Sequence, residues 1–361
     1  MKKVYILIGT RPNFVKITQF KKVAKELGGI DIKIIHSNQH YDGNMSSVFF
    51  KQFGIDIDIM LEPFKGNSSE QFGHIMQQLS RVFVEKRPDF LLVVGDVNTT
   101  LAGALAANKL GIPLGHLESG LRSYDREMPE EINRIITDEI SDIYFTTESS
   151  GTNNLLKEGR KKENVFFVGN TMIDTLVAYQ SQIKSSKIIS QIGVPQKPFI
   201  LMTLHRPSNV DSKESLLKVC YLLENLSKIK NVVFPIHPRT KKNLIENGLF
   251  DRVKDLTSLF LTESLDYFSF QKLISEAEIV ITDSGGIQEE TTFLQIPCLT
   301  LRDNTERPIT ISLGTNELMP FNPELILQKV ENNEFKSGKI PDLWDGQATN
   351  RAIEIMKTHI K

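Results

Sequence analysis

Residues 90–100 read FLLVVGDVNTT, and the fold can be inferred outward from this stretch. Its five apolar residues, Phe90–Val94, have the length of one buried strand, and Gly95-Asp96 forms a polar turn at the strand's end. The segment that follows, Thr99–Leu110, has the spacing of a helix. The same succession of strand, polar turn and helix recurs along the chain, which predicts βα units and mostly parallel sheets.

This pattern occurs in two series, and we predict further strands at Val4–Ile8, Ile32–His36, Pro113–Leu117, Ile143–Phe145, Val165–Val168, Phe199–Thr203, Val232–Ile236, Leu259–Leu261, Ile279–Thr282 and Cys298–Leu301. The segment 181–198 between the series is rich in Ser, Lys and Gln and has no sustained apolar stripe. We therefore predict an α/β protein with two Rossmann-like lobes, residues 1–180 and 199–345, joined by the connection 181–198. A C-terminal helix is predicted within 346–361, and the sequence does not determine which lobe it packs on.

Length and charge exclude several classes of function. The chain has 361 residues, enough for about two domains of ordinary size. Its 43 Lys and Arg residues balance 44 Asp and Glu residues, for a formal net charge of −1. A balanced charge creates no field that would hold a polyanion, so binding to nucleic acid or to an acidic membrane surface is not expected.

The cysteines and the N-terminus predict a cytoplasmic protein. The two cysteines, Cys220 and Cys298, are too few and too far apart for a disulfide framework or a thiolate zinc site. The apolar run Val4–Ile8 is too short for a signal peptide, and no stretch approaches the ~20 apolar residues of a membrane-spanning helix.

Charged and polar residues follow six of the predicted strands, where open α/β sheets bind ligands. Each has an ordinary explanation when taken alone, because loop residues are solvated and a carboxylate after a strand often caps a helix. Their joint placement at strand ends instead predicts a functional cleft between the lobes. These residues are Arg11, Asp96, Glu118, His205, His237 and the run Asp283-Ser284-Gly285-Gly286.

Ser284-Gly285-Gly286 precedes a helical segment and predicts a phosphate or diphosphate site, because glycines at a helix start let backbone N–H groups approach an anion. Arg11 and Arg307 have the guanidinium groups that suit such a ligand, and Glu290 has a carboxylate for ribose hydroxyls. A simple turn, surface ion pairs and a solvated helix face are the alternative explanations. No Gly-x-Gly-x-x-Gly motif after a strand and no P-loop motif occurs, so neither NAD nor ATP is indicated.

Several carboxylates and a histidine are candidates for proton transfer. Asp96, Glu118 and the pair Glu130-Glu131 concentrate carboxylates in the first lobe, although acidic residues after Pro129 also suit a first helical turn. His205 is the candidate proton donor to a leaving phosphate. No Cys or third His accompanies the histidines at the strand ends, so no metal site is predicted.

Together these motifs resemble those of one family, the non-hydrolysing UDP-N-acetylglucosamine 2-epimerases. The matching stretches run in order from residue 9 to residue 308. They are Gly9-Thr10-Arg11-Pro12 with Lys16, Gly95–Thr100, His116–Arg122, Met128–Arg134, His205-Arg206, His237-Pro238, Asp283–Glu290 and Arg302–Pro308.

The resemblance implies a glycosyltransferase-B-like fold, a UDP-sugar in the inter-lobe cleft, no cofactor and a homodimer. It also implies a catalytic set of Asp96, Glu118, Glu130 and His205. Phe270 would lie near the uracil. The residues implied to bind the substrate or its UDP moiety are Arg11, Lys16, His237, Phe270, Ser284, Gly285, Gly286, Glu290 and Arg307.

The chain also departs from the family pattern. Asn13 replaces a Glu, Pro207-Ser208-Asn209 replaces a segment with a Glu before the Asn, and residues 36–42 differ from the Gln-His-Arg form of members regulated by their own substrate. These changes argue against activation by UDP-N-acetylglucosamine, and they leave open a modified UDP-sugar substrate, of diacetamido-uronic acid or N-acetylfucosamine type. The run Pro12–Val15 replaces the Ala-Asp-Tyr-Gly of hydrolysing relatives, which favours the non-hydrolysing branch.

The predicted activity is the interconversion of UDP-N-acetylglucosamine and UDP-N-acetylmannosamine, for the supply of surface-polysaccharide precursors. No carbonyl acidifies the C2 hydrogen of the sugar, so we expect UDP to leave first and a 2-acetamidoglucal to form. A UDP-sugar glycosyltransferase is the alternative from a different class. It would need an acceptor and would have no use for three carboxylates in the first lobe.

Overall fold

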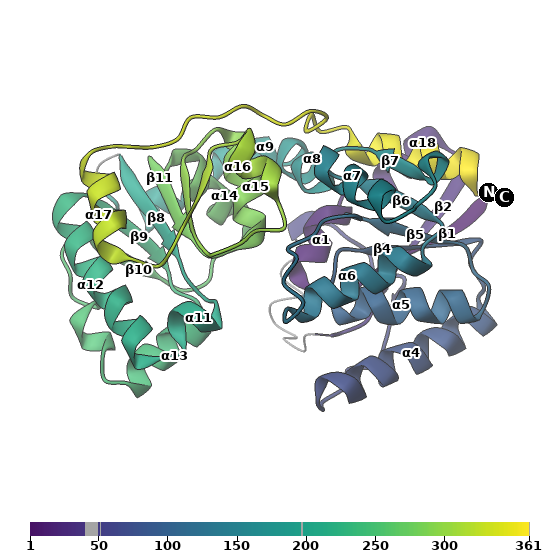
Figure 1. The fold of residues 1–361 in the computed structure, drawn as a ribbon, viewed down its shortest axis with the longest axis horizontal. Coiled ribbons are helices and arrows are strands. Elements are labelled where there is room, and N and C mark those ends of the chain that lie inside the picture. The colour runs from purple at the N-terminus through teal and green to yellow at the C-terminus, as the bar shows by residue number, and fades with distance from the viewer. Residues whose placement is uncertain (40–49, 51, 196–197, 361) are drawn as a thin grey trace. The chain divides into compact units, whose positions relative to one another are not determined.

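The computed structural model describes residues 1–39, 50, 52–195 and 198–360, which divide into two compact units. The first unit comprises Met1–Ala178 and Asp342–Lys361, and the second comprises Tyr179–Pro341. Figure 1 labels the elements of both.

The first unit is built on a seven-stranded sheet with the strand order β3-β2-β1-β4-β5-β6-β7, and its strand pairings are parallel. Its strands are β1 (Lys2–Ile8), β2 (Ile30–His36), β3 (Ile59–Met60), β4 (Phe90–Val94), β5 (Leu114–Leu117), β6 (Ile143–Thr146) and β7 (Val165–Phe167). Its helices are α1 (Arg11–Ile17), α2 (Phe20–Leu27), α4 (Ser68–Glu85), α5 (Asn98–Lys109), α6 (Pro129–Ile140), α7 (Ser149–Lys157), η1 (Lys162–Asn164), α8 (Thr171–Ala178) and α18 (Ala348–His359).

The second unit repeats this architecture with a six-stranded parallel sheet of order β10-β9-β8-β11-β12-β13. Its strands are β8 (Phe199–Thr203), β9 (Asn231–Pro235), β10 (Leu259–Thr262), β11 (Ile279–Thr282), β12 (Cys298–Leu301) and β13 (Asn316–Met319). Its helices are α9 (Gln180–Ser185), α10 (Ile188–Gln191), α11 (Pro207–Val210), α12 (Lys213–Ile229), α13 (Pro238–Glu246), η2 (Phe250–Arg252), α14 (Tyr267–Glu276), α15 (Gly285–Leu294), α16 (Pro308–Ser312) and α17 (Pro323–Glu331).

Both sheets place the third, second, first, fourth, fifth and sixth strands of their unit side by side in that order, which is the doubly wound Rossmann order. Successive strands are therefore added toward one edge of the sheet and then toward the other, and the change falls between β1 and β4 in the first unit and between β8 and β11 in the second. Connections leave in opposite directions at such a switch point, which opens a crevice at the carboxyl ends of the two strands.

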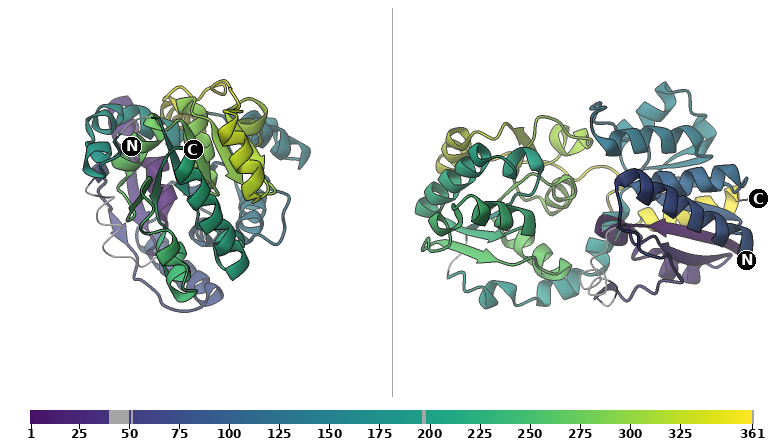
Figure 2. Two further views of the ribbon diagram at one scale, coloured as in Figure 1. Left: turned by 90° about the vertical axis from the view of Figure 1, so that its left-hand side faces the viewer. Right: turned by 90° about the horizontal axis from the view of Figure 1, so that it is seen from below.

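Helices cover both faces of each sheet (Figure 2), so a central strand such as β4 is a continuous apolar run. In β8, Ile200 packs in one cluster with Leu223 of α12, whereas its neighbour Leu201 packs in another with Leu273 of α14. In the first unit, Val93 of β4 packs with Leu79 of α4. Alternate side chains of a strand thus fill two cores, one on each face.

The structure confirms the eleven predicted strands, to within two residues at each end. Of the strands in the described residues, β3 and β13 were missed. β3 has only two residues, and β13 begins with Asn316 and Glu317 at the edge of its sheet, so neither forms the apolar run on which the prediction relied.

The boundaries of the units differ from the predicted ones. Within 181–198, residues 181–185 and 188–191 are helical, and Ile188 is buried with Leu273 and Ile274 in the second unit's core. The chain returns to the first unit at Asp342, before the predicted boundary. There the buried Trp344 donates from Nε1 to the Thr147 carbonyl at 2.9 Å.

The final helix, α18, packs on the first unit against α2 and α8 (Figure 1). The backbone N–H groups of Ala348 and Thr349 donate to the carboxylate of Asp174 at 3.1 and 2.6 Å, so this buried side chain caps the helix. Lys2 Nζ donates to the Ile360 carbonyl at 3.1 Å and ties the two ends of the chain together.

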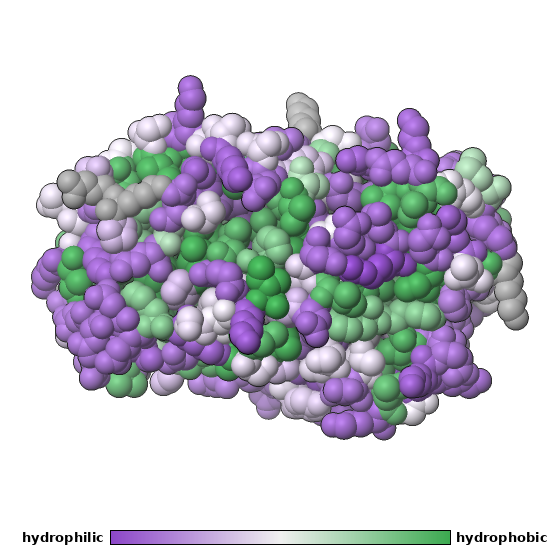
Figure 3. Space-filling view, turned by 90° about the horizontal axis from the view of Figure 1, so that it is seen from above, coloured by the Kyte–Doolittle hydropathy of each residue, from purple (hydrophilic) through white to green (hydrophobic). Residues whose placement is uncertain are grey.

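Polar and charged residues surround scattered apolar ones on the face drawn in Figure 3. Over the described part of the chain, none of the helices combines the length and the apolar character needed to cross a membrane.

Candidate active site

The first unit carries its candidate residues at the carboxyl edge of its sheet, around the switch point. Arg11 is the first residue of α1, which follows β1, and Asp96 follows β4. Glu118 follows β5, and Glu130 is the second residue of α6. The fold therefore brings together turns that lie as much as 119 residues apart in the sequence.

Glu118 occupies a strained position on the backbone. Its φ of 71° lies in the left-handed region, which costs a residue with a side chain of order 1–3 kcal/mol. The N–H groups of Glu118 and Ser119 both donate to the Phe145 carbonyl, at 3.0 and 3.1 Å, and hold the turn in this shape. Strained residues of this kind cluster at functional sites, because the fold must supply the energy that keeps the strain, so this conformation is consistent with Glu118 as a candidate.

The carboxylate of Glu118 is buried and forms an ion pair with Lys16 Nζ, which α1 supplies. Gly95 lies beside this pair with a φ of 66°. A Cβ at Gly95 would meet Lys16 Nζ at 3.4 Å and Glu118 Oε2 at 3.6 Å. The turn after β4 thus passes directly alongside the ion pair.

Arg134 joins Asp96 to a buried carboxylate. Its guanidinium contacts Asp96 Oδ2 and, at 2.5 Å, Glu131 Oε2. Glu131 is fully buried and also accepts from Ser123 N at 2.9 Å and from Tyr124 N at 3.0 Å. Glu131 is therefore an internal anchor for the loop before α6.

Its neighbour Glu130 is exposed, so the two members of the predicted carboxylate pair differ in environment.

Asn13, which stands at one of the departures from the family pattern, is buried, and its Oδ1 accepts from Gly9 N at 3.1 Å and from Thr10 N at 3.2 Å. It fixes the turn that precedes Arg11. Of residues 36–42, the stretch 40–42 lies outside the described residues.

A buried charge network that the sequence analysis did not single out lies beneath these turns. His116 Nδ1 is 2.6 Å from Asp138 Oδ1, and Arg122 NH1 is 2.7 Å from Asp138 Oδ2. Burial alone would raise the pKa of Asp138, but the adjacent His116 and Arg122 bring it below its ordinary value. His116 and Arg122 belong to the motif around Glu118, which was the available signal.

The second unit carries a histidine and aspartate pair at its own switch point. His205 follows β8 and Asp283 follows β11, and His205 Nδ1 is 2.7 Å from Asp283 Oδ1. The His205 side chain is 41% exposed, whereas Asp283 is fully buried. An aspartate on Nδ1 directs the other ring nitrogen, Nε2, away from itself, which is the arrangement of a general acid or base.

The sequence analysis noted Asp283 only as part of a run and missed its contact with His205. Asp283 Oδ2 also accepts from the N–H of Arg206 at 2.9 Å and from Asn209 Nδ2 at 3.1 Å. Burial would raise the pKa of Asp283, but the His205 side chain, together with the backbone N–H groups of Arg206 and His205, lowers it.

Ser284 is the N-cap residue of α15, and Gly285 and Gly286 are its first two residues. A Cβ at Gly285 would lie 2.9 Å from Glu306 Oε1, so a side chain does not fit there without displacement. The N–H groups of a ten-residue helix thus begin at the switch point, beside Asp283. Such a helix start is a suitable place for a phosphate.

His237 follows the neighbouring strand β9 and caps α13, with Nδ1 accepting from Arg239 N at 3.1 Å. Its ring centroid is 5.4 Å from that of His205. Phe270 lies on α14, where it is partly buried against the apolar cluster of that helix. The predicted residues His237 and Phe270 therefore also have structural contacts.

Glu290 and Arg307 are both buried in the second unit. Desolvation raises the pKa of Glu290 to about 8, with a further contribution from Glu289. Arg307 Nε lies 2.6 Å from Glu289 Oε2, and Arg307 NH1 contacts Glu306 Oε1. The guanidinium is thus held in place by carboxylates close to Gly285, whose Cβ position is 3.2 Å from Arg307 NH1.

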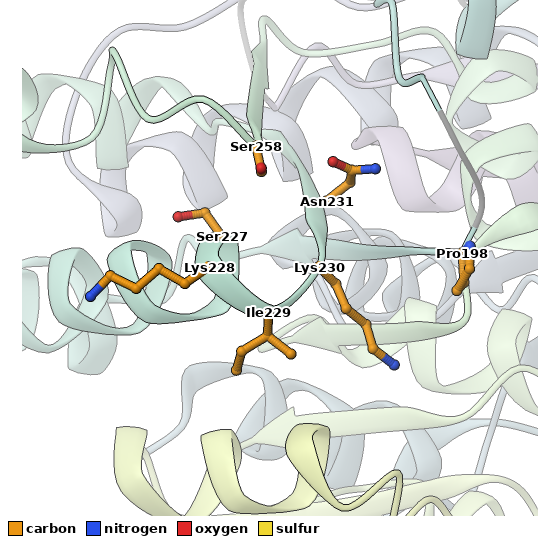
Figure 4. A pocket seen from close by; sticks show the side chains of 7 residues that line it. All are labelled: Pro198, Ser227, Lys228, Ile229, Lys230, Asn231 and Ser258. Atoms are coloured by element: carbon orange, nitrogen blue, oxygen red, sulfur yellow. The ribbon is translucent and has the colours of Figure 1, made fainter.

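Among the described residues, no group of three or more His, Cys, Asp or Glu side chains is arranged to hold a metal ion. A hollow of about 290 Å³ lies at the opposite edge of the second sheet, where β8, β9 and β10 begin (Figure 4). Lys230, which lines it, is paired with Glu278 at 2.7 Å. This hollow contains none of the candidate residues.

Comparison with known proteins identifies relatives over the whole chain. A family model described as UDP-N-acetylglucosamine 2-epimerase matches residues 22–357. The UDP-N-acetylglucosamine 2-epimerase of Methanococcus maripaludis is 43% identical over 359 residues, covering 94% of this chain and 97% of the relative. The UDP-2,3-diacetamido-2,3-dideoxy-D-glucuronate 2-epimerase of Pseudomonas aeruginosa is 35% identical, covering 98% of this chain and 99% of the relative.

A solved structure of the Methanocaldococcus jannaschii UDP-GlcNAc 2-epimerase, in complex with UDP-GlcNAc and UDP, has a TM-score of 0.89 and 39% sequence identity and covers 99% of each chain. The two parallel sheets and these neighbours confirm the predicted class, an α/β enzyme of glycosyltransferase-B-like fold. Within that class, the chain belongs to the UDP-N-acetylglucosamine 2-epimerase family, which are isomerases.

Proposed function

We propose that this protein interconverts UDP-N-acetylglucosamine and UDP-N-acetylmannosamine without hydrolysing either. The observation that carries the proposal is the His205–Asp283 pair beside the helix start at Ser284. This arrangement provides a proton donor next to an anion site, which departure of UDP requires. Family membership and the 43% identical relative named for this activity support the same substrate.

The first step is cleavage of the bond between C1 of the sugar and the oxygen of the β-phosphate. The bonding electron pair leaves with UDP, and a proton from Nε2 of His205 neutralises part of the developing charge. The helix start at Ser284–Gly286, together with Arg11 and Arg307, would bind the diphosphate. Glu290 would accept hydrogen bonds from the ribose, and Phe270 would contact the uracil.

The second step removes the hydrogen from C2. Loss of UDP gives C1 oxocarbenium character, which acidifies that hydrogen, and its electron pair forms the double bond of a 2-acetamidoglucal. The base and the acid come from Asp96, Glu118 and Glu130. Lys16 would compensate the charge of Glu118. Return of a proton to the opposite face of C2, followed by re-addition of UDP to C1, completes the epimerisation.

A modified UDP-sugar is the second candidate substrate. The Pseudomonas aeruginosa relative, 35% identical, is named for a diacetamido-glucuronate sugar. The departures at residues 13 and 207–209 fall in the motifs that carry the family resemblance, but Asn13 has structural hydrogen bonds that account for its presence. We further propose that the enzyme is a cytoplasmic homodimer that supplies surface-polysaccharide precursors.

The test is proton NMR of the purified protein with UDP-N-acetylglucosamine in D₂O, without NAD and without an acceptor. We expect UDP-N-acetylmannosamine with deuterium at C2 and retention of the UDP linkage. Free UDP with N-acetylmannosamine would contradict the non-hydrolysing assignment. Conversion of a diacetamido-uronic acid nucleotide alone would establish the second candidate.

Two variants on α6 distinguish the loss of a catalytic carboxylate from the loss of a surface charge. We expect Glu130→Gln on α6 to lower kcat severely, whereas Glu139→Gln, an exposed carboxylate on the same helix, should leave it unchanged. Asp96→Asn should also lower kcat severely with the fold intact. Near-normal turnover in Asp96→Asn or Glu130→Gln would remove that residue from the proposed mechanism.

A further inference from the structure

His116 is a buried side chain that contacts the turn before Asp96 and is not one of the candidate site residues. It is the third residue of β5, is fully buried, and comes two residues before Glu118. Its Nε2 is 2.8 Å from the carbonyl oxygen of Gly95, in the turn that leads to Asp96. Its Nδ1 is 2.6 Å from Asp138 Oδ1, which α6 supplies.

Both partners of the His116 ring accept hydrogen bonds. A carbonyl oxygen has no proton to give, so Nε2 must donate to Gly95. Asp138 accepts from Gly120 N at 3.0 Å and faces Arg122 at 2.7 Å, so it is a carboxylate and Nδ1 must donate to it as well. An imidazole that donates from both nitrogens is a cation.

The surroundings of His116 balance this charge. Asp138 also pairs with Arg122, and Arg122 pairs with Glu158 at 2.6 Å. The four side chains thus alternate in charge and, with His116 protonated, have no net charge. The Tyr144 side chain on the adjacent strand adds no charge, because burial raises its pKa to about 12. A buried cation is tolerated where its partners neutralise it and satisfy its hydrogen bonds.

The same contacts join the two turns that matter. His116 holds Gly95 directly, and through Asp138 it holds the N–H of Gly120, on the far side of Glu118. We propose that His116 is a positioning residue that carries both ring protons and fixes the turns bearing Asp96 and Glu118. This inference rests on the proposed function for its catalytic consequence. The protonation of His116 and its effect on the stability of the two turns can be measured separately.

The first test is NMR of the full-length protein with ¹⁵N-labelled histidine. We expect two ring N–H protons for His116 between pH 6 and pH 8, assigned by their absence in His116→Gln. In Asp138→Asn, whose amide can donate to Nδ1, we expect the Nδ1 proton to disappear and the Nε2 proton to remain. A single ring proton in the wild-type protein would overturn the proposal, whether or not either variant folds.

The second test measures the turns and the reaction. Hydrogen exchange of the Gly120 amide should be at least tenfold faster in His116→Gln than in His359→Gln, a control at an exposed histidine of α18. The kcat should fall about tenfold to a hundredfold, with the KM for UDP-N-acetylglucosamine within about threefold. Unchanged exchange at Gly120, or a kcat within twofold of wild type, would overturn the positioning role. If the wild-type protein turned over no UDP-sugar, the proposed function would fail, whereas the ring protons and the exchange rates would still be tested.

Discussion

Replacing Asp283 with Asn tests the role of the His205 pair most directly. In the wild-type protein, Oδ1 accepts from His205 Nδ1 at 2.7 Å, and Oδ2 accepts from Arg206 N at 2.9 Å and from Asn209 Nδ2 at 3.1 Å. The Asn oxygen can take the place of Oδ2 and keep the contacts with Arg206 N and Asn209 Nδ2. Its NH₂ group then faces Nδ1, which must become an acceptor.

The magnitude follows from the bond that is lost. A hydrogen bond to a charged partner contributes about 1.5–3 kcal/mol, and about 1.4 kcal/mol corresponds to a factor of ten. If this bond stabilises the protonated imidazole that gives its proton to UDP, kcat should fall by about tenfold to about 150-fold. The KM should change little, because Nδ1 points toward Asp283 and away from the exposed side of the ring.

The assay is the initial rate of UDP-N-acetylmannosamine formation, with circular dichroism and thermal melting as checks on the fold. Asp211→Asn is the matched control, because Asp211 lies in the same unit and pairs with Arg239 at the surface. A well-folded Asp283→Asn enzyme with a kcat within twofold of wild type would refute the reasoning. So would a large rise in KM at unchanged kcat.

Three further outcomes are expected. Burial raises the pKa of Glu290 to about 8, so hydrogen bonds from the ribose of UDP to the ionised carboxylate should release nearly one proton on binding at pH 7. Calorimetry in two buffers of different ionisation enthalpy measures this proton release, and Glu290→Gln should abolish it. Gly95→Ala should destabilise the first unit by about 1–2 kcal/mol, because φ is 66°, and should also lower kcat; Gly54→Ala, with φ of 62° and open space around its Cβ, should show the stability loss alone. Asp138, whose pKa is lowered by His116 and Arg122 despite burial, contributes stability above the unfolded-state pKa of about 3.8 that is lost as pH falls through the folded value. Trp344, the single tryptophan, lies in the first unit, so its fluorescence should report this acid unfolding and Asp138→Asn should weaken its pH dependence.

Much of the fold was predictable because its signals are local. An apolar run such as Phe90–Val94 is buried on both faces of a parallel sheet, so hydrophobicity alone locates it. The strand β13 was missed because an edge strand has one neighbour and needs no continuous apolar run. The return of the chain to the first unit at Asp342 was also out of reach, since it depends on where Trp344 and α18 find partners.

The candidate site divides in the same way. Motifs such as Gly95-Asp96 and Ser284-Gly285-Gly286 are contiguous, and their chemistry is legible from residue types and from their place after strands. The difference between Glu130 and Glu131 is not legible, because both are acidic residues in a first helical turn. Only the packed structure shows that Glu131 is buried against Arg134 and Ser123, while Glu130 is exposed.

The sequence by itself determined the parallel α/β class, the strands and the turns that carry reactive groups, because each depends on residues close together in the chain. Tertiary structure decided which of those groups are paired. Asp283 meets His205 across 78 residues, and His116 meets Asp138 across 22. Such pairs depend on which strands are neighbours in the sheet, because a hydrogen bond reaches only a few ångströms.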